Sequence, residues 1–275
     1  MKLSVVIPAR DEAGNVGATV DALADRLRRE GIAYEILVVD DGSRDSTCEE
    51  IEERSRRDPG IRLVRNPGPH GFGRAVRYGL ERFSGDAVVI AMADASDDPD
   101  DVITYYRVLR DEADCVFGSR FVRGGSTTGY PGFKLAINRL ANMLVRGLFG
   151  LRYNDTTNAF KGYRREVIAG CQPLISPHFN LTVELPLKAI VRGYGYKVVP
   201  IRWTNRKRGT SSLRLEEQGS RYLFIVLHVW LEWLLTKGDY RRPSGERFEP
   251  WRARPGASDE GESPEFGRDR EGIAS

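Results

Sequence analysis

The sequence predicts an α/β protein in which a mostly parallel sheet is flanked by helices. Short apolar runs at residues 3–7, 34–39, 61–64 and 87–92 are typical of buried strands. Between them lie segments with helical spacing of apolar residues, such as Val20, Leu23 and Leu27 within 18–29. This alternation requires parallel strands, right-handed crossovers and helices on both faces of the sheet.

The composition argues against a nucleic-acid-binding protein, a disulfide-rich protein and a protein with a membrane span. A chain of 275 residues can form one large α/β domain or two small ones, and a net charge of +3 gives no reason to expect a nucleic-acid partner. The three cysteines are widely spaced without a CxxC pair, which predicts neither a disulfide framework nor a zinc site. With no signal-peptide layout and no run of about 18 apolar residues, we expect a cytoplasmic protein without a membrane span.

In the first half, Pro8 is expected to stop the first strand, and a helix follows at 18–29. The strand at 34–39 ends in acidic residues, and Ser46 or Thr47 is expected to cap the helix after it. The strand at 61–64 leads into a loop at 66–73 that is rich in Gly and Pro, and a helix then runs through Phe83.

In the second half the alternation is less regular. Helices are predicted at 102–109, 134–149, about 164–169 and 183–191, and strands at 115–118, 158–163 and 196–203. The helix at 134–149 carries Leu135, Leu140, Leu144 and Leu148 near one face. We expect residues 1–213 to form one domain.

The helix predicted at 215–235 differs from the others. From 222 to 235 only His228 and Glu232 are polar, and with Arg221 they form one narrow stripe. These residues span roughly 21 Å at ~1.5 Å per residue, too short for a hydrocarbon core of ~30 Å. Residues 214–237 therefore either lie in a membrane interface or pack against the domain or a partner subunit. A membrane protein is one possible partner. Residues 238–275 are rich in charge, Gly, Pro and Ser and are predicted to be a disordered tail.

Acidic side chains follow three of the predicted strands, at 8–12, 40–45 and 94–100. Because carboxyl ends of parallel strands meet at one edge of a sheet, we expect a shared polar crevice that holds a divalent cation and a diphosphate. Asp40 or Asp41 could bind a base or ribose, and Gly42 would allow close backbone approach. The alternative for the last cluster is a solvated loop in which Asp97 or Asp98 caps the next helix. Neither GxGxxG nor a P-loop pattern is present.

An ordered set of motifs identifies a resemblance. VVIPARDE, VVDDGSRDST, GFGRAVRYGL, ADASDDP, GSRF, NAFKGYRREV and NRKRGTSSL extend from residue 3 to about 213. Together they resemble family 2 glycosyltransferases of the GT-A fold, particularly the polyprenol-phosphate sugar synthases, which include dolichyl-phosphate mannose synthases.

The resemblance implies an inverting transfer of a hexose from a nucleotide-diphosphate sugar, of the GDP-mannose or UDP-glucose type, to a polyprenyl or dolichyl phosphate. This would occur at the cytoplasmic face of a membrane. Motif matches place the donor at Pro8, Ala9, Arg10, Glu12, Asp40, Asp41, Gly42, Gly71 and Gly73.

The same resemblance assigns the metal site. Asp94 falls at the last acid of the DxD motif, whose usual role is to hold Mg²⁺ or Mn²⁺, and is expected to be catalytic. Met92 replaces the first acid of that motif, so we expect a weakened metal site in which Ser96 supplies a second oxygen.

A lipid phosphate monoester is largely ionised near neutral pH, so the acceptor needs positioning by cations more than it needs a base. The candidates are Arg120, which is also the second expected catalytic residue, with Arg139, Arg206, Arg208 and Ser211. The basic loop departs from the subgroup's pattern at Asn205 and Ser212. Residues 192–221 carry eight basic side chains against two acidic ones, which suits docking on a membrane.

Two other functions remain open at this point. A glycosyltransferase with a soluble or sugar acceptor could use Glu184 as a base, although a Glu at this place more often begins a helix. The loss of the first DxD acid at Met92 is also consistent with a non-catalytic scaffold that binds a nucleotide sugar.

Overall fold

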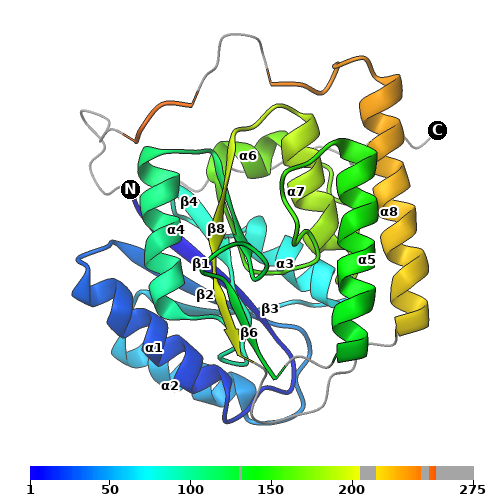
Figure 1. Cartoon of the computed structure of the whole chain (residues 1–275). Coiled ribbons are helices and arrows are strands. Elements are labelled where there is room, and N and C mark those ends of the chain that lie inside the picture. The colour runs from blue at the N-terminus through cyan, green and yellow to red at the C-terminus, as the bar shows by residue number, and fades with distance from the viewer. Residues whose placement is uncertain (130–131, 205–214, 243–247, 252–275) are drawn as a thin grey trace, which may run out of the picture.

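The computed structural model describes residues 1–129, 132–204, 215–242 and 248–251 (Figure 1). Within them, seven strands form one sheet in the order β3-β2-β1-β4-β7-β5-β8. Their bounds are β1 Leu3–Ala9, β2 Tyr34–Asp40, β3 Ile61–Arg65, β4 Ala87–Ile90, β5 Cys115–Ser119, β7 Lys161–Arg164 and β8 Tyr196–Pro200. β7 is antiparallel to β4 and β5, and the other pairs are parallel. The predicted α/β class is confirmed.

The prediction that Pro8 stops the first strand is wrong. β1 continues to Ala9, and Pro8 is in register with Val39 of β2. On its other side β1 pairs with β4 only over residues 3–6. Pro8 therefore lies beyond that ladder, where its missing N–H costs little.

Helices cover both faces of the sheet. α1 Val16–Arg29, α2 Thr47–Arg57 and α4 Pro99–Asp111 pack on one face, and α3 Phe72–Leu80, α6 Arg165–Gly170 and α7 Leu181–Val191 pack on the other. Neither Ser46 nor Thr47 caps α2 as expected. Asp45 accepts hydrogen bonds from the backbone and hydroxyl of Thr47, while the same hydroxyl accepts from the backbone N–H of Glu12.

α5 Gly132–Phe149 and α8 Leu215–Leu235 lie side by side outside α7 (Figure 1). Val183 and Leu187 of α7 form a third apolar core with Val145 of α5 and with Ile225 and Val229 of α8. The polar stripe of α8 faces the domain, since Glu232 pairs with the buried Arg192 at 2.8 Å. α8 thus packs on the domain. No described helix is long and apolar enough to cross a membrane.

Two further elements differ from expectation. The strand predicted at 196–203 is divided at Ile201 into β8 and β9 Arg202–Thr204, and β9 pairs with β6 Ser126–Thr128 in a separate sheet. Of the predicted tail at 238–275, residues 238–242 and 248–251 are described, and both stretches contact the domain. Arg242 contacts Asp114 at 3.1 Å, and Arg164 lies 4.3 Å from the ring centroid of Phe248.

Candidate active site

The loop after β4 folds tightly around Asp94. Asp94 accepts a hydrogen bond from the backbone N–H of Ser96 at 3.2 Å, and Ala95 between them has φ +56°. Asp97 turns back and accepts from the backbone N–H of Met92 at 2.9 Å. Burial raises the pKa of Asp97 to about 7, with the nearby Asp94 carboxylate adding to the rise.

The other two acids of this cluster have structural roles. Asp98 caps α4 by accepting from the backbone N–H of Asp100 at 2.9 Å, and it also pairs with Arg202. Asp100 pairs with Arg26 of α1 at 2.6 Å. The capping alternative is therefore correct for Asp98. The acidic site at the end of β4 consists of Asp94 and Asp97.

The donor set suits a metal that shares its ligands with a substrate. Asp94 offers a carboxylate and Ser96 a hydroxyl, whereas the described residues contain no group of three or more acidic, His or Cys side chains that could hold a metal ion. Mg²⁺ is commonly bound by one or two carboxylates together with substrate phosphates and water. The residues thus fit Mg²⁺ or Mn²⁺ bound with a diphosphate.

The ends of β1 and β2 form the adjoining part of the edge. Ala9 is in register with Asp40, and the Asp40 carboxylate accepts from the backbone N–H of Ser43 at 2.9 Å. The backbone N–H of Asp11 donates to the Ser43 hydroxyl at 3.1 Å. These bonds join the two loops. Pro8 and Ala9 are buried and Arg10 is exposed.

Asp41, expected to bind the donor, holds the loop after β3. Its buried carboxylate accepts from the Asn66 side chain and the Gly71 backbone N–H, both at 2.7 Å, and contacts His70 at 3.3 Å. A Cβ atom on Gly42, whose φ is +82°, would lie 2.7 Å from the His70 ring. His70 therefore covers Gly42, a contact that sequence reasoning missed.

Gly71 and Gly73 each lie close to the backbone of another loop of the protein. A Cβ on Gly73 would lie 2.4 Å from the carbonyl oxygen of Ser176, and one on Gly71 would lie 2.6 Å from that of Pro177. These Cα atoms face the protein's own loop at 176–178. Their lack of a side chain is thus explained by packing against that loop, and the donor assignment of both glycines is an untested prediction.

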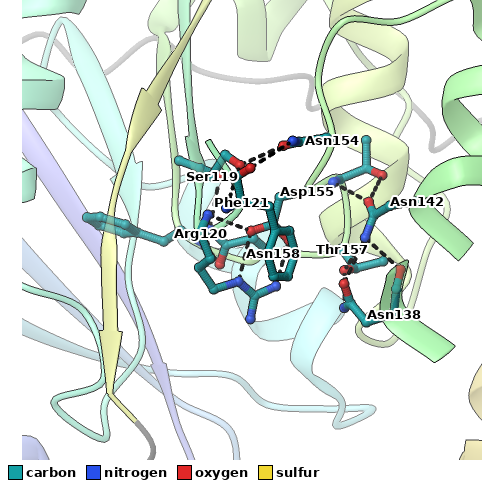
Figure 2. Close-up of polar contacts among 12 residues, drawn as sticks. Ser119, Arg120, Phe121, Asn138, Asn142, Asn154, Asp155, Thr157 and Asn158 are labelled. Carbon is teal, nitrogen blue, oxygen red and sulfur yellow. Dashed lines mark hydrogen bonds and ion pairs between the residues drawn. The ribbon is translucent and has the colours of Figure 1, made fainter. Parts of the chain in front are cut away.

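Arg120 is held by a buried carboxylate. Asp155 accepts from the Arg120 backbone N–H at 3.0 Å, from Nε at 2.8 Å and from a terminal nitrogen at 2.6 Å (Figure 2). Arg139 of α5 lies 4.7 Å from the ring centroid of Phe121, and Arg120 lies 5.3 Å from the same centroid. The structure therefore brings two of the predicted acceptor arginines together. Sequence reasoning missed Asp155, although the polar run NDTTN at 154–158 marked it.

Trp203 connects this arginine pair to the acidic site. The Arg120 guanidinium lies 5.9 Å from the Trp203 ring centroid, and Trp203 forms a β-bridge with Asp97. The next residue, Thr204, donates to the backbone carbonyl of Ser96 at 3.4 Å. The basic loop predicted at Arg206, Arg208 and Ser211 lies outside the described residues, but the chain enters it beside Ser96.

Glu184 is satisfied within the fold. Its carboxylate accepts from the backbone N–H groups of Ile175 and Ser176 at 2.8 and 2.7 Å, and from Lys188 at 2.8 Å. It is fully buried and holds the loop at 173–177 against α7. Its position supports the structural interpretation over that of a base.

Lys161 fastens the loop that carries Asp155. Its ammonium donates to the backbone carbonyl oxygens of Thr156 and Thr182 at 3.0 and 2.9 Å, and also to that of Asn158. Burial lowers the pKa of Lys161 to about 7.

This lowered pKa predicts a pH-dependent stability difference between the wild type and Lys161→Met. Below pH 7 both folded and unfolded states hold the proton, and the folded state bears the full cost of the buried charge. Above pH 7 the folded state loses the proton first, so wild-type stability relative to the variant rises by up to about 1.4 kcal/mol per pH unit. Thermal unfolding of both proteins from about pH 6 to about pH 9 measures this, and a constant difference would contradict the shift.

The family model for glycosyl transferase family 2 matches residues 4–170. The chain belongs to this family. A dolichol-phosphate mannosyltransferase of Pyrococcus furiosus is 32% identical over 219 residues, covering 78% of this chain and 60% of that protein. A polyprenol monophosphomannose synthase of Mycolicibacterium smegmatis is 31% identical over 217 residues, covering 76% and 80%. The chain thus spans less than two thirds of the Pyrococcus relative.

Solved structures confirm the GT-A fold of this family 2 glycosyltransferase. Glucosyl-3-phosphoglycerate synthase from Mycobacterium tuberculosis, in complex with Mn²⁺, UDP and phosphoglyceric acid, matches with a TM-score of 0.63 at 20% identity, covering 84% of this chain and 78% of that one. The same enzyme with Mg²⁺ and UDP gives 0.62 at 20% identity, covering 84% and 79%.

Proposed function

We propose that this glycosyltransferase moves a hexose from a nucleotide-diphosphate sugar, of the GDP-mannose or UDP-glucose type, to a polyprenyl phosphate at a membrane surface. The observation that carries the proposal is the pair Arg120 and Arg139 beside Phe121, joined through Trp203 to the acidic end of β4. Arginines that would bind the acceptor phosphate thereby lie near carboxylates that would hold a metal ion with the donor diphosphate. The two curated relatives carry names of the same reaction class.

On the donor side, Asp94 with Ser96 would hold Mg²⁺ or Mn²⁺. When bound, the metal supplies positive charge to the diphosphate that leaves. The loops at 10–12 and 40–43 would hold the nucleoside. Arg10 is exposed in the first of them. Asp40 holds Ser43 in the second, and the Ser43 hydroxyl joins the two loops by accepting from the Asp11 backbone N–H.

On the acceptor side, a phosphate oxygen attacks the anomeric carbon from the face opposite the diphosphate. The new C–O bond forms as the bond to the diphosphate breaks, and the diphosphate leaves with the electron pair, which inverts the configuration. Arg139 offers an exposed guanidinium and Arg120 a guanidinium locked by Asp155. Their role is to orient the phosphate and screen its charge from the departing group.

Two helices next to these arginines expose apolar side chains to solvent. On α5 they are Ile137, Leu140, Met143 and Leu144, and on α8 they are Leu223, Phe224, Leu227, Leu231, Trp233, Leu234 and Leu235. The predicted leucine face of α5 is thus partly turned to solvent. Arg139 and Arg146 are exposed on α5 as well. Exposed apolar area with basic side chains supports docking on an anionic lipid surface.

This docking predicts that Leu140→Glu and Leu227→Glu each weaken binding to vesicles. An exposed leucine that enters lipid contributes about 1.5–3 kcal/mol, so each change should reduce binding at least about tenfold without unfolding the protein. Co-sedimentation with phosphatidylcholine vesicles containing phosphatidylglycerol measures it. Ile175→Glu, at an exposed apolar position in a loop outside both helices, is the matched control. Unchanged binding of both leucine variants, or an equal loss for the control, would refute membrane docking by these helices.

The transfer itself is tested by incubating the protein with GDP- and UDP-sugars, with and without a polyprenyl phosphate and with and without Mg²⁺ or Mn²⁺. The expected product is a polyprenyl phosphosugar that requires both the lipid phosphate and the metal. Transfer to phosphoglyceric acid or a free sugar instead would favour the soluble-acceptor alternative. Binding of the nucleotide sugar without any turnover would favour a non-catalytic scaffold.

A further inference from the structure

Two asparagines on α5 connect this helix to the loop that follows Tyr153. Asn142 is buried, and its side-chain oxygen accepts from the backbone N–H of Thr156 at 2.6 Å and from its hydroxyl at 2.5 Å (Figure 2 shows its amide at the centre of this network). Its amide nitrogen donates to the backbone carbonyl of Asn138 at 2.9 Å. Asn138 in turn donates to the Thr157 hydroxyl at 2.7 Å. These two side chains thus join the helix to two consecutive loop residues.

Helix α5 carries one arginine of the candidate acceptor site, and the 154–158 loop holds the other. Arg139 belongs to α5 itself and lies beside Phe121. Arg120 is held by Asp155, the residue immediately before Thr156. A shift of the loop relative to the helix would therefore change the separation of the two guanidinium groups.

An asparagine at this buried position of a helix lowers the stability of the fold unless its side chain makes these hydrogen bonds. Asparagine is a poor helix former, and burying an amide is unfavourable unless its hydrogen bonds are made. Leucine has a similar volume but would leave the Thr156 N–H and hydroxyl without their acceptor. Aspartate would keep that acceptor, but it would lose the donations to the backbone and side-chain oxygens of Asn138 and to the Thr157 hydroxyl, and it would bury a charge.

We propose that Asn142 is a positioning residue that sets the spacing of Arg120 and Arg139 for the acceptor phosphate. The inference rests on the proposed function, because the acceptor is the phosphate that these arginines would bind. It assigns Asn142 no contact with substrate. Its effect is specific to the acceptor, since the contacts of Asn142 are with α5 and the 154–158 loop, whereas the candidate donor residues lie at the ends of β1 and β2.

The test is steady-state kinetics with a short-chain polyprenyl phosphate in detergent, which removes membrane docking from the measurement. We expect Asn142→Leu to lower kcat/KM for the acceptor about 10- to 100-fold, the size of a misplacement near 1 Å, and to leave the donor KM within about twofold. Asn142→Asp, which keeps the acceptor for Thr156, should recover part of this loss. If Asn142→Leu does not fold, Asn138→Ala, which removes the bond to Thr157 and one acceptor of the Asn142 amide but keeps the bonds of Asn142 to Thr156, should give a smaller loss in the same direction.

Asn180→Ala is the matched control, because Asn180 is a buried asparagine that accepts a backbone hydrogen bond from His178 just before α7 and, among the residues that the structure describes, makes no bond to α5 or to Thr156. An equal loss for donor and acceptor, or the same acceptor loss in Asn180→Ala, would show a structural role only and overturn the inference. A wild type that transfers while Asn142→Leu keeps its acceptor kinetics would overturn the inference alone. A wild type that uses no lipid phosphate would overturn the proposed function and the inference with it.

Discussion

Asp94→Ala is expected to lower transfer at least about a thousandfold while the protein stays folded. In the described residues the site offers one other carboxylate, that of Asp97, which is occupied by the Met92 backbone. Removing Asp94 would therefore weaken binding of the metal ion whose positive charge balances the diphosphate, an effect comparable to losing a central electrostatic group. Transfer assays at saturating Mn²⁺ measure the loss, and circular dichroism checks the fold.

Asp98→Ala is the matched control for this experiment. Asp98 lies four residues away and caps α4, so its loss should cost about 1 kcal/mol of stability and little activity. Direct binding of Mn²⁺ in the presence of the nucleoside diphosphate, followed by electron paramagnetic resonance, separates metal binding from turnover. Retained transfer in Asp94→Ala, or unchanged Mn²⁺ binding, would remove Asp94 from the metal role.

Arg120→Ala is expected to destabilise the fold by about 3–5 kcal/mol, because it leaves the buried Asp155 carboxylate without its partner. Asp155→Ala should cost a similar amount. The double variant should lose clearly less than the sum of the two, since it leaves no uncompensated charge. Urea unfolding measures all three, and additive losses would contradict the buried pair.

The activity of Arg120→Ala therefore cannot be interpreted as loss of phosphate binding alone. Arg139→Ala is the cleaner probe, since Arg139 is exposed on α5. It should leave stability within about 0.5 kcal/mol and raise the acceptor KM about tenfold or more with little change in donor KM. Equal effects on both substrates would argue against an acceptor site at this pair.

The fold was predictable from the sequence because its signals are local. Apolar runs gave the strands of the sheet to within a few residues, and the period of apolar residues gave α8 its full length, Leu215–Leu235. Acids after parallel strands predicted a shared edge, and the register of Ala9 with Asp40 confirms it. The strand ends were less predictable, since the extension of β1 past Pro8 depends on where the neighbouring strand β4 stops.

For the candidate site, the sequence indicated which residues to consider but not which groups each of them contacts. Sequence spacing cannot show that Asp155 reaches back 35 residues to hold Arg120, or that Asp41 is occupied by Asn66 and Gly71. It also could not show that Gly73 packs against a loop formed by residues 176–178. Each of these contacts depends on tertiary structure.

The way α8 meets α7 bears on how this protein can be produced for study. Ile225 and Val229 complete an apolar layer with Val183 and Leu187. A protein truncated before residue 215 would expose that layer to solvent and would therefore tend to self-associate. A better-behaved reagent would keep the entire helix and exchange only its outward leucines for polar residues.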